Sequence, residues 1–125
     1  MGVNILIIED DSRVSRYISQ VAKRLGLVCL AAGKKSDIAA IYNSAMPDII
    51  LLDPKPREEQ CEKVLRILGE LHTDVPIVLA DTTPEELARL EELGRSLGLH
   101  MQGFLPGVFD TEALRGELAS VFNIH

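Results

Sequence analysis

The amino-acid sequence predicts an α/β fold in which five strands alternate with five helices around a parallel sheet. Short, wholly apolar runs alternate along the chain with stretches whose apolar residues recur at helical spacing. The run Ile49–Leu52 has no polar alternation, as expected for a parallel strand that helices cover on both faces. A length of 125 residues suits one compact domain, which we expect to occupy residues 1–125.

The first half of the chain is expected to form three strands and two helices. Asn4–Ile8 is the first strand, and the amphipathic stretch after it ends at Gly26, a residue typical of helix C-termini. Leu27–Ala31 is the second strand, and Ser36 is a candidate cap for the short helix that follows. Ile49–Leu52 is the third strand.

The second half is expected to form three helices and two strands. The third helix carries an apolar stripe, and Ile77–Ala80 is the fourth strand. Thr83 is the N-cap expected for the fourth helix, with a proline at the first helical position and Glu86 completing a capping box. Gly103–Leu105 is the fifth strand, and Asp110 is the cap expected for the last helix.

Composition and charge exclude several classes of function. The net charge is -6 and no basic stripe is present, so this domain is not expected to bind nucleic acid. No apolar run approaches the roughly 20 residues that a membrane span needs. Cys29 and Cys61 are expected to be reduced, packed thiols of a cytoplasmic protein.

Acidic residues follow two of the predicted strands. Glu9, Asp10 and Asp11 come directly after the first strand, and Asp53 comes directly after the third. Ligands of open parallel sheets bind beyond the carboxyl ends of the strands, so neighbouring strands would bring these carboxylates together. Packed like charges need a cation, and Mg²⁺ prefers such hard oxygen ligands. Asp11 has an alternative role outside such a cation site, as the N-cap of the following helix.

Four segments resemble the receiver (CheY-like) domain of bacterial two-component response regulators, and the resemblance covers essentially the whole chain. Asn4–Ser12 resembles the opening strand and acid pair, and Pro47–Asp53 the phospho-acceptor strand. Val75–Ala80 and Gly103–Leu105 resemble the fourth and fifth strands. The resemblance implies a flavodoxin-like, doubly wound sheet with strand order 2-1-3-4-5.

The resemblance also implies roles for individual residues. Asp53 would accept a phosphoryl group from a histidine kinase or phosphotransfer protein. Glu9, Asp10 and Asp53, with the backbone carbonyl of Lys55, would hold Mg²⁺ or Mn²⁺. A carboxylate is a usable nucleophile toward phosphorus, and a divalent ion neutralises charge on the transferring group. Such a domain is a signalling module rather than an enzyme, with at most self-catalysed phosphoryl transfer and autodephosphorylation.

The positions that convert phosphorylation into a conformational switch depart from the family pattern. Receivers place Ser or Thr where this chain has Asp81, and Lys where it has Gly107. A carboxylate about 6 Å from an acyl phosphate would cost roughly 3 kcal/mol. Three remedies stay open: Asp81 joins the metal shell, Lys55 supplies a cation, or the register shifts by one and Thr82 donates the hydroxyl. Phe104 matches the switching aromatic, or it is plain core.

Two functional hypotheses therefore stand beside each other. One is a phosphate-accepting signalling domain, and the other is a pseudo-receiver that binds proteins without phosphate. The family also implies a homodimer through the fourth helix, fifth strand and fifth helix. Lys34 and Lys35 belong either to a solvated loop or to the acidic crevice. An enzyme of the haloacid-dehalogenase type fits poorly, because Lys55 stands where its second acid would be required.

Overall fold

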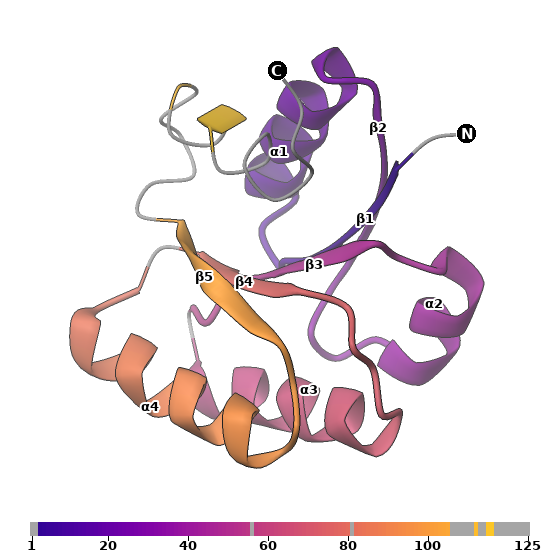
Figure 1. The fold of residues 1–125 in the computed structure, drawn as a ribbon. Coiled ribbons are helices and arrows are strands. Elements are labelled where there is room, and N and C mark those ends of the chain that lie inside the picture. The colour runs from indigo at the N-terminus through magenta and orange to yellow at the C-terminus, as the bar shows by residue number, and fades with distance from the viewer. Residues whose placement is uncertain (1–2, 56, 81, 106–111, 113–114, 117–125) are drawn as a thin grey trace.

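A computed structural model of the chain describes residues 3–55, 57–80, 82–105, 112 and 115–116. Figure 1 shows strands alternating with helices along this part of the chain. The elements are β1 (Val3–Ile8), α1 (Ser12–Arg24), β2 (Leu27–Ala32), α2 (Ile38–Ala45), β3 (Ile49–Leu52), α3 (Glu58–Glu70), β4 (Ile77–Ala80), α4 (Pro84–Ser96) and β5 (Met101–Leu105). The fifth predicted helix, with its Asp110 cap, falls largely outside the described residues.

The five strands form one parallel sheet in the order β2-β1-β3-β4-β5, which confirms the predicted α/β fold and strand order. Ile5 in β1 lies opposite Cys29 in β2 and Ile49 in β3, so β1 runs between the two. β5 begins at Met101, two residues before the predicted start at Gly103. Because all strands are parallel, their carboxyl ends lie at one edge of the sheet.

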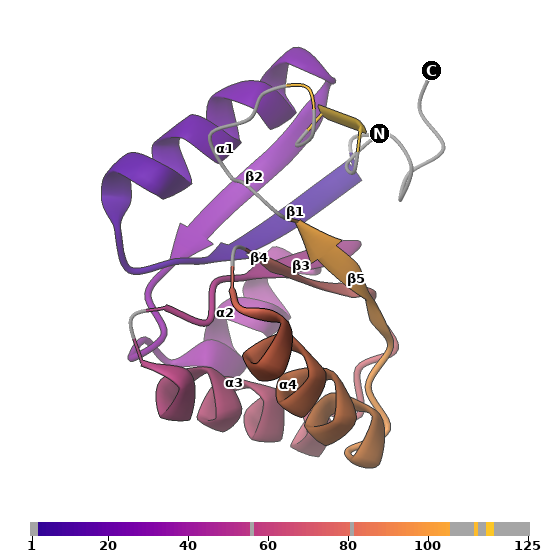
Figure 2. The ribbon, with the colours of Figure 1, turned by 90° about the vertical axis from the view of Figure 1, so that its left-hand side faces the viewer.

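Helices cover both faces of this sheet (Figure 2). Ile5 and Ile7 point to the face that α1 covers, where they pack with Ile18 and Val21. Alternate residues such as Leu6 contribute to the second core, which lies on the face covered by α2, α3 and α4. Strand residues are therefore buried on both faces, which explains why the strands contain no polar alternation.

The helix starts depend on local side-chain bonds. Thr83 caps α4 as predicted, because its hydroxyl accepts the backbone N–H of Glu86 at 3.2 Å. The prediction that Ser36 caps α2 was wrong. Asp37 is the cap, and its carboxylate accepts the N–H of Ala40 at 3.1 Å. The Ser36 N–H instead closes a turn in the preceding loop, which places Ser36 one residue too early to cap the helix.

Both cysteines are free thiols, as predicted. Burial raises the pKa of Cys61 to about 12, which keeps this thiol protonated and chemically inert. Burial also raises the pKa of Cys29. None of the described helices has the length and apolar content that crossing a membrane requires.

Candidate functional site

Backbone hydrogen bonds hold the ends of three neighbouring strands together beyond the strands themselves. The N–H of Glu9 donates to the carbonyl of Ala32 at 2.8 Å, which joins the end of β1 to the end of β2. The N–H of Asp53 donates to the carbonyl of Ile8 at 3.1 Å, which joins the end of β3 to β1. The acids predicted to converge therefore lie at one edge, together with the loop that follows β2.

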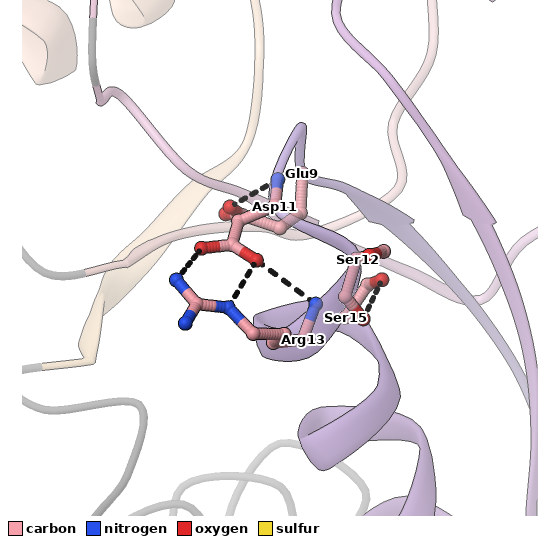
Figure 3. Close-up of polar contacts among 5 residues, drawn as sticks. All are labelled: Glu9, Asp11, Ser12, Arg13 and Ser15. Atoms are coloured by element: carbon pink, nitrogen blue, oxygen red, sulfur yellow. Dashed lines mark hydrogen bonds and ion pairs between the residues drawn. The ribbon is translucent and has the colours of Figure 1, made fainter.

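Glu9 is the buried acid of this edge, with only 7% of its surface exposed. Its Oε1 atom accepts the backbone N–H of Asp11 at 3.0 Å (Figure 3). Burial, followed by a hydrogen bond with the Asp53 side chain, raises the pKa of Glu9 to about 8. The raised pKa favours the protonated form of Glu9 at neutral pH in this arrangement.

Asp11 serves the following helix. Figure 3 shows its carboxylate facing Arg13, whose backbone N–H it accepts at 2.9 Å as the N-cap of α1. The Arg13 guanidinium also bonds the carboxylate, and these bonds lower the pKa of Asp11. The N-cap reading of Asp11 is confirmed, and this acid is engaged away from the crevice.

Lys34, in the loop between β2 and α2, enters the acidic crevice. Its side chain has no exposed surface, and its ammonium lies 2.9 Å from Oδ2 of Asp10. The same Nζ donates to the backbone carbonyl of Asp53 at 3.0 Å and to that of Lys55 at 2.6 Å. One ammonium therefore joins the loops that follow β1 and β3.

The backbone of the β2–α2 loop strengthens this contact. The N–H of Lys34 donates to Oδ1 of Asp10 at 2.8 Å, so both carboxylate oxygens of Asp10 bind the same residue. A Cβ atom on Gly33 would lie 3.0 Å from Oδ1, so glycine allows this close approach. Burial acts to raise the pKa of Asp10, but the bonds from Lys34 outweigh it, and the pKa is lowered.

Asp53 is the predicted phospho-acceptor, and it lies at the end of the fully buried strand β3. Its side chain is partly exposed, unlike that of Glu9. Oδ1 of Asp53 accepts the backbone N–H of Lys55 at 3.0 Å, which turns the chain immediately after the acid. The carboxylate can therefore be reached from solvent while its backbone stays fixed to the sheet.

Two curated response regulators match the chain in sequence. The DNA-binding transcriptional regulator NtrC of Proteus hauseri is 23% identical over 87% of this chain. The phosphate regulon regulatory protein PhoB of Pseudomonas aeruginosa is 30% identical over 74% of it. The matches cover 22% and 42% of those proteins, so this chain spans less than half the length of either relative. No protein-family model matches the chain.

Solved structures decide the fold. A response regulator from Colwellia psychrerythraea superposes with a TM-score of 0.80 at 22% identity, covering 100% of both chains. This is a receiver fold. The chemotaxis response regulator CheY4 of Vibrio cholerae gives a TM-score of 0.76 at 19% identity, covering 97% of this chain and 99% of that one. The chain thus resembles receiver domains of response regulators in both sequence and fold.

The predicted metal ligands of the receiver fold do not fit a divalent ion as they are arranged here. Lys34 binds both oxygens of Asp10 and the carbonyl of Lys55, two of the four predicted ligands. Mg²⁺ lies about 2 Å from its oxygen ligands, so an ion on the Lys55 carbonyl would stand within about 5 Å of the ammonium. In the described part of the chain, no three His, Cys, Asp or Glu residues are placed to hold a metal.

The switch positions of the receiver fold are described only in part. Asp81 and Gly107 lie outside the described residues, as does the side chain of Phe104. β4 ends at Ala80, and Asp81 is the next residue in the chain. The hydroxyl of Thr82 donates to the carboxylate of Glu86 in α4. Thr82 is therefore engaged by the fourth helix.

Lys34 is one of the residues whose role the sequence alone left open. The sequence placed it either in solvent or in the crevice, and the structure places it in the crevice, while Lys35 is exposed. A signal was present. β2 neighbours β1, so the loop after β2 starts at the same edge as the acids, and Gly33 precedes the lysine. A cluster of acids beside a glycine–lysine pair on the neighbouring strand end indicates an internal ion pair.

Proposed function

We propose that this receiver domain accepts a phosphoryl group on Asp53 from a histidine kinase or phosphotransfer protein. The position of Asp53 carries the proposal: it is a partly exposed carboxylate fixed by its backbone to the end of a buried central strand. Glu9 is buried, and both oxygens of Asp10 are bound by Lys34. Asp53 therefore has a partly exposed side chain on a backbone fixed to the sheet, where an incoming phosphate donor can reach it.

The proposed transfer is a substitution at phosphorus. A carboxylate oxygen of Asp53 attacks the phosphoryl group in line with the leaving imidazole of phosphohistidine. The new P–O bond forms as the P–N bond breaks, and the departing nitrogen takes its proton from the donor site or from water. The chain contributes position and charge. The Lys55 N–H holds one Asp53 oxygen at 3.0 Å, and the Lys34 ammonium provides positive charge at the edge.

The partner surface on α4 remains part of the proposal. The family resemblance implied a homodimer through the fourth helix, fifth strand and fifth helix, and charged residues of α4 form ion pairs within the chain. Arg89 binds Glu58 of α3 through two bonds of 3.2 and 3.1 Å, and Arg95 binds Glu91 at 3.1 Å. Dimerisation through α4 and β5 would therefore rely on other groups of this face, and light scattering after gel filtration measures it directly.

Phosphorylation by a small-molecule donor tests the proposed function. The full chain is incubated with phosphoramidate, with and without Mg²⁺, and intact mass spectrometry counts phosphoryl groups. We expect one phosphoryl group, which the Asp53→Asn variant does not acquire. Labelling that persists in Asp53→Asn would place the modification on another residue, and absence of labelling in the wild-type chain under both conditions would reject phosphate acceptance.

We keep a second candidate function, a protein-interaction module that works without phosphate. Lys34 already joins the loops after β1 and β3, so the edge is held in one arrangement before any phosphate arrives. Such a domain would bind its partner equally well with and without the phosphoryl analogue beryllofluoride. A change in amide chemical shifts across α4 and β5 on adding beryllofluoride would support phosphate acceptance instead.

A further inference from the structure

The ammonium of Lys34 has all of its hydrogen-bonding capacity satisfied. An ammonium carries three N–H donors, and Nζ has three oxygen acceptors: one carboxylate oxygen of Asp10 and the carbonyls of Asp53 and Lys55. The lysine side chain has no exposed surface. Lysine is rarely buried unless its charge is paired, as it is here. Three converging oxygens around a buried charge form a cation site made by the chain itself.

The oxygens that Lys34 binds coincide with those expected for the divalent ion. The Asp10 carboxylate and the Lys55 carbonyl are two of the predicted metal ligands, and the third acceptor is the backbone carbonyl of Asp53. A lysine that merely covered the crevice would pair with a carboxylate and leave the carbonyls to solvent. Lys34 instead bonds two carbonyls on the far side of the crevice. They belong to Asp53 and Lys55, which lie 19 and 21 residues further along the chain.

We propose that the Lys34 ammonium is a built-in cation that takes the place of the divalent metal, so that this site keeps its shape without bound Mg²⁺. This inference rests on the proposed function in one respect: that function identifies this edge of the sheet as the place where a divalent ion is expected. A metal ion would have to displace Lys34 and break three bonds, or bind beside a buried positive charge. The geometry agrees, because the ammonium lies 2.9 Å from the Asp10 carboxylate and offsets its charge.

A test of whether a metal ion can replace the Lys34 ammonium distinguishes this inference from a purely structural ion pair. If Lys34 only stabilised the fold, its removal would lower stability, and added metal would not restore it. If Lys34 stands in for the ion, its removal opens a site of carboxylate and carbonyl oxygens that a divalent ion can fill. Lys34→Met keeps most of the apolar stem and removes the charge. Lys35→Met is the matched control, because Lys35 is the adjacent lysine and is exposed.

The experiment measures divalent-ion binding directly. Mn²⁺ binding is followed by water-proton relaxation and Mg²⁺ binding by the shift in Tm, for the wild-type chain, Lys34→Met and Lys35→Met. We expect the wild type and Lys35→Met to show no Tm shift at millimolar Mg²⁺. Lys34→Met should melt at a lower temperature, regain Tm as Mg²⁺ is added, and bind Mn²⁺ at least about tenfold more tightly than the wild type.

Two results would overturn the inference: millimolar or tighter Mn²⁺ binding by the wild-type chain, or a Lys34→Met variant that folds and gains no metal affinity. If Lys34→Met does not fold, Lys34→Gln is refolded with and without Mg²⁺, and Mg²⁺-dependent recovery of the fold is then the expected result. Equal recovery in both buffers would count against the inference. Phosphoramidate labelling of Asp53 is measured separately by mass. Absence of labelling in the wild-type chain would reject the proposed function, and the metal-binding result would still stand.

Discussion

The loop after β1 and the loop after β2 lie side by side at the carboxyl edge of the sheet and carry opposite charges. Their strands pair up to Ile8 and Ala32, so the acids of one loop face the lysine of the other. Glu9 and Asp10 are neighbours with opposite pKa shifts: burial raises the pKa of Glu9, and Lys34 lowers that of Asp10 despite some burial. The pKa of Glu9 is thus shifted mainly by burial, and that of Asp10 by its bonds with a residue of the other loop.

Lys34 and Lys35 repeat this contrast within one loop. They are adjacent and chemically identical, yet the Lys34 side chain is fully buried and Lys35 is exposed. Gly33 leaves room for the close approach to Asp10, and the backbone N–H and ammonium of Lys34 both bond that acid. Two lysines in a row therefore provide a matched pair for testing what burial of a charge does here.

The largest effect is expected from Lys34→Met. Removing one member of a buried ion pair typically costs 3–5 kcal/mol, and the partial exposure of Asp10 reduces this to about 2–3 kcal/mol. Urea unfolding followed by circular dichroism measures the loss. Lys35→Met should change the free energy of unfolding by less than about 0.5 kcal/mol. Similar losses in both variants would show that the contrast between the two lysines is wrong.

The coupling between Lys34 and Asp10 is the second test. A double-mutant cycle with Lys34→Met and Asp10→Asn should give an interaction energy of about 1–2 kcal/mol, because the two side chains are in direct contact. The same cycle with Asp11→Asn should give no measurable coupling, since Asp11 faces Arg13. Coupling to Asp11 as large as that to Asp10 would contradict the arrangement of the acid loop.

The loop after β4 offers a smaller effect, because Thr82 and Thr83 bond α4 rather than a buried charge. Thr83→Ala removes the N-cap of α4 and should lower the free energy of unfolding by about 1 kcal/mol. Thr82→Val removes the bond to Glu86 and should have a smaller effect. Thermal unfolding monitored by circular dichroism compares the two, and a larger loss in Thr82→Val would reverse their assigned roles.

The smallest effect is expected where charge lies at the surface. Glu58→Gln breaks the pair with Arg89 that joins α3 to α4, in which the Arg89 side chain is 58% exposed and that of Glu58 is 25% exposed. We expect a slight fall in Tm that disappears in high salt, because exposed pairs are screened. The destabilisation by Lys34→Met should persist in the same salt. Salt sensitivity of equal size in both variants would contradict the burial of Lys34.

The fold could be predicted from the sequence because its signals are local. Apolar runs such as Ile49–Leu52 report burial within four residues, and Thr83 caps the helix that begins immediately after it. The prediction of Ser36 as a cap was wrong because the adjacent Asp37 is also a suitable residue, and only the path of the preceding turn decides between them. Element types follow from composition and spacing, and their boundaries follow from backbone geometry.

The site could be predicted only in part. Glu9, Asp10 and Asp53 were expected at one edge because strand ends in a parallel sheet must meet there. The sequence did not predict that Lys34 supplies the positive charge at this edge. Its bond to Asp10 spans 24 residues and depends on how the β2–α2 loop turns. Sequence spacing identifies residues that share an edge. It does not show which of two adjacent lysines enters the crevice.

Direct observation of the Lys34 ammonium tests the central claim most directly. In ¹⁵N NMR spectra of the side-chain NH₃⁺ groups, a buried ammonium with three acceptors exchanges its protons slowly, and an exposed one exchanges them rapidly. We predict a sharp Lys34 signal that is unchanged by millimolar Mg²⁺, and no signal from Lys35. A Lys34 signal that is lost, or that shifts toward the exposed form as Mg²⁺ is added, would show that the metal displaces the lysine and would contradict the account.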